Sequence, residues 1–215
     1  MLKDADIREP LFEFLEETYG KIRIIEEKTM GRSRADVLMV TEQALYGIEI
    51  KSDADTYARL SRQVKDYDKY FDYNIVVAGA SHGLHIREHV PDYWGVITVE
   101  EVDHAMDFYE LRQPQQNPKR KLERKLQILW RPELVELQER NQMPRYKDKS
   151  KAFVQKKIVE RTTFPEGKKG RIEEVDLHRQ ISEILFERDY TTIAETLQEY
   201  RKEQKTKHVA HRGKA

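Results

Sequence analysis

The segment ADVLMVTEQALYGIEIKS, residues 35–52, decides how the first half of the chain folds. Residues 35–40 and 45–50 are apolar and contain β-branched side chains, whereas the interval 41–44 is mostly polar. This pattern predicts two short strands joined by a tight turn. Because both strands are strongly apolar, we expect the hairpin to lie in the middle of a sheet rather than on the surface.

Three charged residues interrupt this apolar hairpin. If the turn centres between Glu42 and Gln43, residues whose numbers sum to 85 face each other, so Asp36 lies opposite Glu49. Side chains alternate between the two faces of a strand, and Glu49 therefore shares a face with Lys51. The hairpin thus predicts two carboxylates and one amine in a single patch. A surface hairpin with ordinary salt bridges is the alternative.

Two carboxylates opposed on neighbouring strands repel each other, by up to about 1 kcal/mol at exposed sites and by more where water is excluded. A hard divalent cation such as Mg²⁺ offsets this repulsion, because it binds carboxylate and carbonyl oxygens. Asp36, Glu49 and the carbonyl of Ile50 are the candidate ligands. Such a metal activates water and neutralises charge on a phosphate, and Lys51 is the candidate for orienting that water.

The spacing of these residues resembles that of a known superfamily. Asp36, twelve intervening residues and then Glu49-Ile50-Lys51 resemble the D…(D/E)-x-K motif of the PD-(D/E)XK nucleases, which have the restriction-endonuclease-like fold. The wider text GRSRADVLMV…LYGIEIKSDADTYARLSRQVKDY looks like a bacterial and phage branch of that superfamily, and the resemblance covers roughly residues 5–105. Ala35 stands where many members have proline.

The resemblance also implies supporting residues. Gln63-x-x-x-Tyr67 resembles the Q-x-x-x-Y motif that follows E-x-K in some members, so Gln63 joins the catalytic candidates and Tyr67 the supporting ones. Members often place a carboxylate of the first helix near the metal, which makes Glu9 or Glu13 a candidate, with a surface position as the alternative. Asp53 follows the hairpin closely enough to reach the site, although helix capping is the favoured explanation for it.

The predicted elements give an α/β fold in which a mixed sheet is flanked by helices. Their order, α-β-β-β-α-β, is that of the restriction-endonuclease-like core, and a C-terminal α-helical extension follows. The strand at 74–79 is apolar throughout, as expected for a strand covered on both faces. The other expected elements are a helix at 6–19, a strand at 21–27, a loop at 28–34, a helix at 57–72, a short helix or loop at 82–89 and a strand at 94–99.

The formal net charge of zero hides two oppositely charged halves. Residues 1–113 carry 14 Lys+Arg and 23 Asp+Glu, giving −9, and residues 114–215 carry the other 25 and 16, giving +9. The acidic half suits metal binding, and the basic half suits contact with a phosphate backbone. A solvated helical arm is the alternative for the basic half.

The segment QPQQNPKRK, rich in proline and glutamine, divides the chain. We expect a nuclease-like domain at 1–112, a linker at 113–121, a basic helical region at 122–205 and a disordered tail at 206–215. The text WRPELVELQERNQMPRYKDKSKAFVQKKIVER loosely resembles the SAP-type helix–loop–helix module, which implies contact with DNA. A basic helical hairpin packed on the first domain is an equal alternative.

Basic residues in both halves are candidate contacts to nucleic acid. Arg32 and Arg34 precede the first carboxylate of the hairpin, and Arg59 and Arg62 lie on the helix that follows it. The alternative for Arg34 is an ion pair with a neighbouring acid. The alternative for Arg59 and Arg62 is a solvated face of the helix. The candidates in the basic region are Lys147, Lys149, Lys151, Lys156 and Lys157.

Composition limits the class of protein. No cysteine is present, so disulfides and cysteine-based zinc sites are excluded, and a reducing cytoplasm fits. No apolar run approaches the ~20 residues of a membrane span. These limits fit a cytoplasmic protein. The hairpin and the family that it resembles imply a nuclease that uses Mg²⁺ or Mn²⁺ and acts on DNA in repair, recombination, phage or defence processes. The alternatives are an RNA-processing enzyme and a non-catalytic protein for nucleic-acid binding or complex assembly, with protein partners or a homodimer left open.

Overall fold

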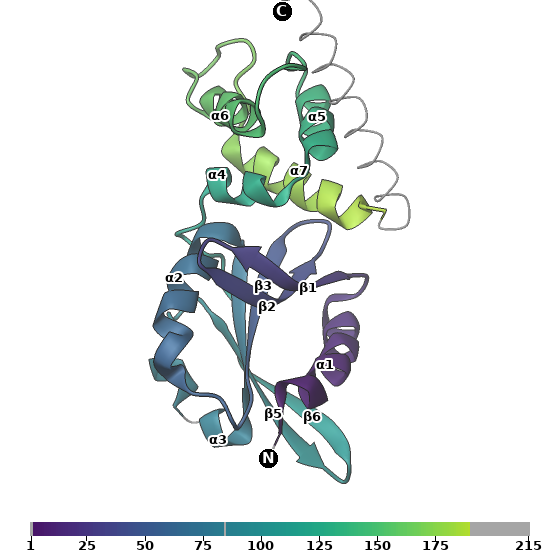
Figure 1. The fold of residues 1–215 in the computed structure, drawn as a ribbon, viewed down its shortest axis with the longest axis vertical. Coiled ribbons are helices and arrows are strands. Elements are labelled where there is room, and N and C mark those ends of the chain that lie inside the picture. The colour runs from purple at the N-terminus through teal and green to yellow at the C-terminus, as the bar shows by residue number, and fades with distance from the viewer. Residues whose placement is uncertain (1, 84, 190–215) are drawn as a thin grey trace, which may run out of the picture.

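The computed structural model describes residues 2–83 and 85–189, and its centre is a six-stranded mixed sheet (Figure 1). The strands follow one another across the sheet in chain order. The pairs β3–β4 and β4–β5 are parallel, and the other three pairs are antiparallel. The strand bounds are β1 Arg23–Met30, β2 Ser33–Val40, β3 Leu45–Lys51, β4 Tyr73–Gly79, β5 Gly95–Val102 and β6 Ala105–Arg112.

Helices lie on both faces of the sheet, with α1 on one side and α2 on the other (Figure 1). The helices of the first half are α1 Asp4–Tyr19, η1 Tyr57–Arg59, α2 Leu60–Tyr70, α3 Ala80–Gly83 and η2 Ile86–Glu88. Those of the second half are α4 Leu122–Lys125, η3 Leu126–Ile128, α5 Arg131–Arg140, α6 Lys151–Thr162 and α7 Glu174–Glu187. The predicted α/β class, the order α-β-β-β-α-β and the helical extension are thus confirmed.

The β2–β3 hairpin has the predicted register. The pairs run from Val37–Ile48 to Val40–Leu45, so the residue numbers sum to 85 throughout. Regular pairing stops at Val37, which leaves Asp36 just beyond the last pair of the ladder. The hairpin is the centre of the first half because both of its strands are buried along most of their length.

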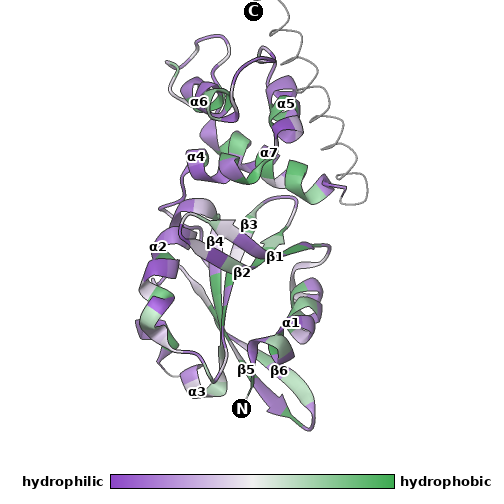
Figure 2. Ribbon diagram, viewed as in Figure 1, coloured by the Kyte–Doolittle hydropathy of each residue, from purple (hydrophilic) through white to green (hydrophobic). Residues whose placement is uncertain are grey.

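Two apolar layers enclose the sheet. On one face, α1 packs Ile7, Leu11 and Leu15 into a cluster with the strands. On the other face, α2 and the helices of the second half join one larger cluster, and Figure 2 shows apolar colour on α7 and on the central strands. Gly47 allows α2 to approach β3 closely, because a Cβ atom there would lie 2.0 Å from the ring of Phe71.

The irregular segment 113–121 joins the sheet to the C-terminal helices, and hydrogen bonds fix it in place. Asn117 is buried, and its side-chain amide donates to the carbonyl of Asp68 at 2.9 Å. Further along, the fully buried ammonium of Lys125 lies 2.5 Å from the carboxylate of Asp72. The helical region therefore packs on the sheet and shares its core, as in the packed alternative given for this region.

Several predicted boundaries are wrong. The expected loop at 28–34 is only a turn at Gly31 and Arg32, because pairing of β1 with β2 continues to Met30–Ser33. The helix expected at 57–72 starts as a 3₁₀ turn and ends at Tyr70. The strand β6 was not predicted, since only one of its faces is partly buried and its charges mask the alternation.

Two expectations concern parts of the chain that the structure does not describe. The disordered tail expected at 206–215 and the last part of the helical region at 122–205 lie beyond the described residues, which end at 189. Within residues 2–83 and 85–189, no helix has the length and apolar character needed to cross a membrane.

Candidate active site

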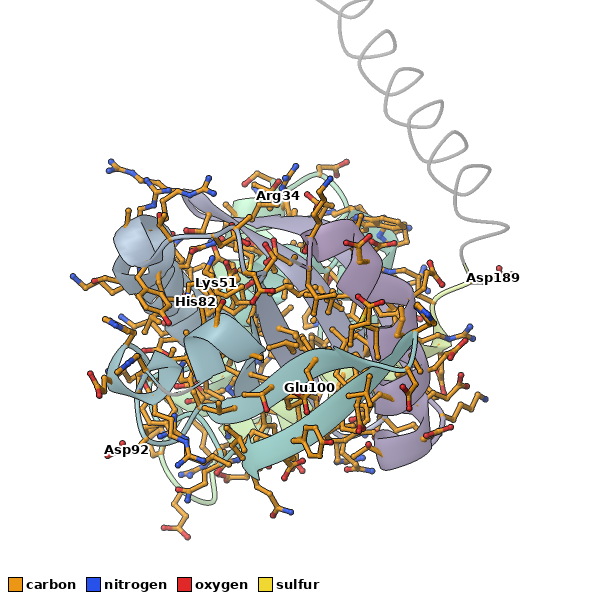
Figure 3. The ribbon with its side chains drawn as sticks, turned by 90° about the horizontal axis from the view of Figure 1, so that it is seen from below. Arg34, Lys51, His82, Asp92, Glu100 and Asp189 are labelled. Carbon is orange, nitrogen blue, oxygen red and sulfur yellow. The ribbon has the colours of Figure 1, made fainter. Side chains whose placement is uncertain are left out.

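A polar cavity of about 280 Å³ lies beside the end of β3. In Figure 3, Lys51 lies between α2 and α1, and Arg34 lies on the same side of the molecule. The lining residues are Asp4, Arg32, Ser33, Arg34, Asp36, Glu49, Ile50, Lys51, Asp55, Arg59, Arg62 and Gln63. The structure thus brings together all the predicted catalytic and metal-binding residues and the four arginines predicted near the hairpin.

Glu49 is the most enclosed group of the site, with only 1% of its surface exposed. Its Oε1 atom accepts from the Lys51 ammonium at 2.5 Å and from the side-chain amide of Gln63. Its Oε2 atom accepts from the hydroxyl of Tyr67 at 2.7 Å. Both carboxylate oxygens therefore have fixed positions, set by neighbours from β3 and α2.

Gln63 completes a closed network with the same two partners. Its Oε1 atom accepts from the Lys51 ammonium at 3.2 Å, while its amide nitrogen donates to Glu49. The amide thus meets an amine with its oxygen and a carboxylate with its nitrogen, which is the complementary orientation. The i+4 spacing from Gln63 to Tyr67 places both on one side of α2, so one helix face positions both supporting groups.

Asp36 is held at the point where the β2–β3 ladder opens. Its Oδ2 atom accepts from the backbone amide of Ile50 at 2.9 Å. The hydroxyl of Tyr67 accepts from the backbone amide of Asp36 at 3.3 Å and so links the two strands through α2. This geometry follows from the close approach of α2 over Gly47, because a larger residue there would push Tyr67 away.

The electrostatics of the site favour an added positive charge. Burial and the nearby carboxylate of Glu49 raise the pKa of Asp36 to about 7, although the Ile50 amide and Lys51 act in the opposite direction. Burial and the same two carboxylates raise the pKa of Tyr67 well above its usual value, so its hydroxyl stays a donor. The two acids of this patch thus oppose each other's ionisation, and an added cation would favour the ionised form of both.

The donor set fits a hard cation that keeps most of its water. Asp36, Glu49 and the backbone of Ile50 line the cavity together. Mg²⁺ is commonly held by one or two carboxylates and several waters rather than by a full protein cage. Among the residues that the structure describes, no group of three or more acidic or histidine side chains could hold a metal ion. Two carboxylates and one backbone carbonyl are oxygen ligands of the kind that a hard divalent cation takes.

The first helix contributes a different carboxylate from the one predicted. Glu9 and Glu13 are exposed and do not line the cavity, whereas Asp4 does. Glu9 and Glu13 thus have the surface position given as their alternative, and Asp4, in the part of α1 that precedes the predicted start, lines the cavity instead. Arg8 contacts Asp4 at 2.7 Å and donates to the carbonyl of Asp36 at 3.3 Å. The i, i+4 spacing of Asp4 and Arg8 is the sequence signal that could have predicted their ion pair at the start of α1.

Asp53 has a structural position outside the cavity. Its carboxylate accepts from the hydroxyl of Ser81 at 2.6 Å and from the amide of Leu2 at 3.1 Å. Asp53 therefore connects Ser81 and Leu2 and does not contact the acids or the lysine of the site. Asp55 lines the cavity instead, and it accepts from the amide of Ser52 at 2.9 Å, as a turn residue does.

The four arginines at the cavity differ in their partners. Arg34 forms an ion pair with Glu27, as one of its two predicted interpretations requires. Arg32, Arg59 and Arg62 are exposed, and no carboxylate pairs with them in the described part of the chain. Three guanidinium groups are thus free to bind an anion beside the two acids.

The lysines predicted in the basic region lie away from the cavity. None of Lys147, Lys149, Lys151, Lys156 and Lys157 is among its lining residues. Lys151 donates to the carbonyl of Gln127 at 3.1 Å, and Lys157 pairs with Glu160 at 2.6 Å. Their contact with nucleic acid stays a prediction.

The fold and the site define a mixed α/β protein with a buried acid–lysine–glutamine network beneath an arginine-lined cavity. The family model described as Bacteriophage P4 protein cII matches residues 1–175, and the chain belongs to that family. No curated protein matches the chain. Among solved structures, the chain is similar to SfsA of Pyrococcus furiosus in complex with Ca²⁺, with 16% identity and a TM-score of 0.30. The match covers 49% of this chain and 59% of SfsA.

Proposed function

We propose that this protein is a metal-dependent nuclease of the PD-(D/E)XK type that hydrolyses phosphodiester bonds in DNA. The observation that carries the proposal is the network in which the Lys51 ammonium lies 2.5 Å from Glu49 and 3.2 Å from Gln63, in the cavity that Asp36 also lines. A lone salt bridge on a hairpin needs neither a supporting amide nor a cavity. Three guanidinium groups that have no acidic partner among the described residues support an anionic substrate.

Each residue has a defined part in this proposal. Asp36, Glu49 and the Ile50 carbonyl would hold Mg²⁺ or Mn²⁺, and the bound metal would activate water and neutralise charge on the phosphate. Lys51 orients the attacking water and stabilises the phosphate oxygens, because its ammonium is fixed by Glu49 and Gln63. Tyr67 fixes the second oxygen of Glu49 and the backbone of Asp36.

The substrate class follows from the charges around the cavity. Arg32, Arg59 and Arg62 would bind the phosphates next to the scissile bond, and the predicted lysines between residues 147 and 157 would add contacts with the backbone. DNA is the proposed substrate, in a repair, recombination, phage or defence process. RNA is the variant of this proposal that the same chemistry allows.

The test uses the full-length protein with single-stranded, duplex, flapped and branched DNA and with matched RNA. We expect cleavage of at least one DNA with Mg²⁺ or Mn²⁺ and none with EDTA. A second measurement is independent of cleavage: each metal should raise the melting temperature of the wild type but not that of Asp36→Asn or Glu49→Gln. Absence of both cleavage and metal stabilisation across the panel would reject the nuclease.

One observation favours a second candidate, a protein that binds nucleic acid without cutting it. Both oxygens of Glu49 accept hydrogen bonds from the chain itself, from Lys51, Gln63 and Tyr67. A site held closed in this way binds phosphate through its arginines alone. Tight DNA binding that is the same with EDTA and with either metal, without cleavage, would support this candidate.

A further inference from the structure

The outer face of α2 carries positive charge that nothing in the described chain neutralises. Arg59, Arg62 and Lys65 are exposed, and no carboxylate pairs with them within residues 2–83 and 85–189. Their i, i+3 spacing places them on one side of the helix. The two acids of the same helix, Asp66 and Asp68, are buried and hydrogen-bonded, so they leave the outer face cationic.

The same charge continues into the segment that follows the sheet. The backbone amide of Lys121 donates to the carbonyl of Lys69 at 3.0 Å, so the end of this segment lies at the C-terminal end of α2. Lys121 and Arg124 are exposed and have no acidic partner among the described residues, although the exposed Glu123 lies between them. The cationic side of α2 is thus extended toward α4.

The neighbouring cations behave differently. Lys119 and Arg120 face Asp68 and Asp72, each at 3.6 Å. In the acidic first half, Arg8 also forms ion pairs with acids, as described above for Arg34 and Lys51. The unpaired cations of this part of the molecule therefore follow one line, from the cavity through α2 to α4. A line of free cations is the usual electrostatic footprint of a phosphate backbone.

We infer that Arg59, Arg62, Lys65, Lys121 and Arg124 form one track that holds the phosphodiester backbone of the substrate strand as it leaves the cavity. The cavity end of this track rests on the proposed function. A helix rises about 1.5 Å per residue, so the stretch from Arg62 to Lys69 is about 10 Å long. Phosphates of one duplex strand are about 3.4 Å apart along the axis, so α2 spans about three of them.

The experiment compares two matched double variants in binding assays with EDTA, so that no cleavage is needed. K121Q/R124Q removes two cations of the track, and K168Q/K169Q removes two exposed lysines from a loop of the second half. Fluorescence anisotropy with a labelled single strand and a labelled duplex, over a range of salt concentrations, gives the slope of log K against log salt. We expect K121Q/R124Q to weaken binding and to reduce this slope by about 1.5, at about 0.7–0.9 per phosphate contact.

K65Q should give about half of this change, and K168Q/K169Q should give none. The track is rejected if K121Q/R124Q leaves the affinity and the salt slope unchanged, or if K168Q/K169Q lowers both equally. It is also rejected if the wild type binds neither the single strand nor the duplex. These results are separate from cleavage, so a binding loss confined to the track variants supports it even if the protein proves not to be a nuclease. If cleavage occurs, K121Q/R124Q should raise KM and leave kcat unchanged, because both residues lie away from the acids.

Discussion

Two lysines of this protein are buried against carboxylates at the same distance but in different surroundings. Lys51 lies 2.5 Å from Glu49 at the cavity, and Lys125 lies 2.5 Å from Asp72 between the sheet and the C-terminal helices. Lys125 also donates to the carbonyl and the hydroxyl of two residues of α7, at 2.8 and 3.1 Å. All three N–H groups of Lys125 are therefore used, since an ammonium has three.

Lys51 has an N–H group without a partner among the described residues, whereas Lys125 has none. Its described partners are Glu49 and Gln63, and it also lines the cavity. A saturated buried lysine joins two parts of a structure, whereas an unsaturated one beside a cavity can donate to a ligand. Burial lowers the pKa of Lys125 to about 8, with Asp72 acting in the opposite direction, and this is the electrostatic cost of the enclosed position. The comparison separates a structural pair from a candidate catalytic one.

The largest effect is expected from Lys125→Ala. This change removes the closest cation from the buried carboxylate of Asp72 and leaves it with the amide of Leu45 at 2.8 Å and Arg120 at 3.6 Å. Breaking a buried pair costs up to about 3–5 kcal/mol of unfolding free energy. Chemical denaturation followed by circular dichroism measures it. The double variant Lys125→Met/Asp72→Asn should recover part of the loss, and a loss below about 1 kcal/mol in the single variant would show that the pair does not hold the two halves together.

Lys51→Ala should act on cleavage rather than on the fold. We expect the cleavage rate to fall on the order of 10²- to 10³-fold, because a positioned donor to the reacting phosphate is lost. DNA affinity should stay close to that of the wild type, since the arginines remain. Single-turnover cleavage and anisotropy binding give the two numbers. Cleavage at the wild-type rate in this variant would contradict the role of Lys51.

Tyr67→Phe tests the support of the site from α2. Loss of the hydroxyl leaves Glu49 Oε2 with one donor fewer, which should cost about 1–2 kcal/mol of stability and lower cleavage. Tyr70→Phe is the matched control on the same helix, because its hydroxyl donates to Gln127 at 3.1 Å, away from the cavity. Equal losses of cleavage in the two variants would mean that Tyr67 acts only through stability.

An effect no larger than that of Tyr67→Phe, and seen only at acidic pH, is expected from His178, the histidine beside Lys125. Burial and the nearby charge of Lys125 lower the pKa of His178 to about 4, against the pull of Asp72 and with a further lowering by Arg120. The unfolded chain binds this proton near pH 6.5, so stability is complete above that pH and falls as the pH drops toward 4.

We therefore expect His178→Asn to remove roughly 1–2 kcal/mol of the stability change between pH 7 and pH 4.5. Denaturation at several pH values, compared with the wild type, measures it. His85→Asn is the control, because His85 is exposed. If the unfolding free energies of His178→Asn and the wild type change in parallel with pH, His178 does not cause the loss of stability in acid.

Much of the first half could be predicted from local sequence. The apolar runs and the polar interval fixed the two strands of the hairpin, and their register followed because a tight turn leaves few alternatives. The same alternation placed Glu49 and Lys51 on one face, and the resemblance to the Q-x-x-x-Y motif implied that Gln63 and Tyr67 lie beside them, as they do. These are relations between residues close in the chain or related by one turn.

The remaining errors concern contacts between distant segments. Asp4 reaches the cavity and Glu9 does not, because the start and rotation of α1 are set by packing on the sheet. Asp53 binds Ser81, a partner that local patterns cannot identify. The strand β6 escaped prediction because its pairing with β5, and not its own weak alternation, makes it a strand.

The sequence by itself therefore determined the hairpin, its register and the shared face of Glu49 and Lys51, since strand alternation is a local rule. The resemblance to the Q-x-x-x-Y motif added Gln63. Only the tertiary structure decided that Tyr67 joins the strands at the opening of the ladder, that four arginines surround the same cavity and that Lys125 is saturated while Lys51 is not. The physical reason is that these features depend on how α2 and the C-terminal helices pack on the sheet, and packing depends on shape and burial across the whole chain.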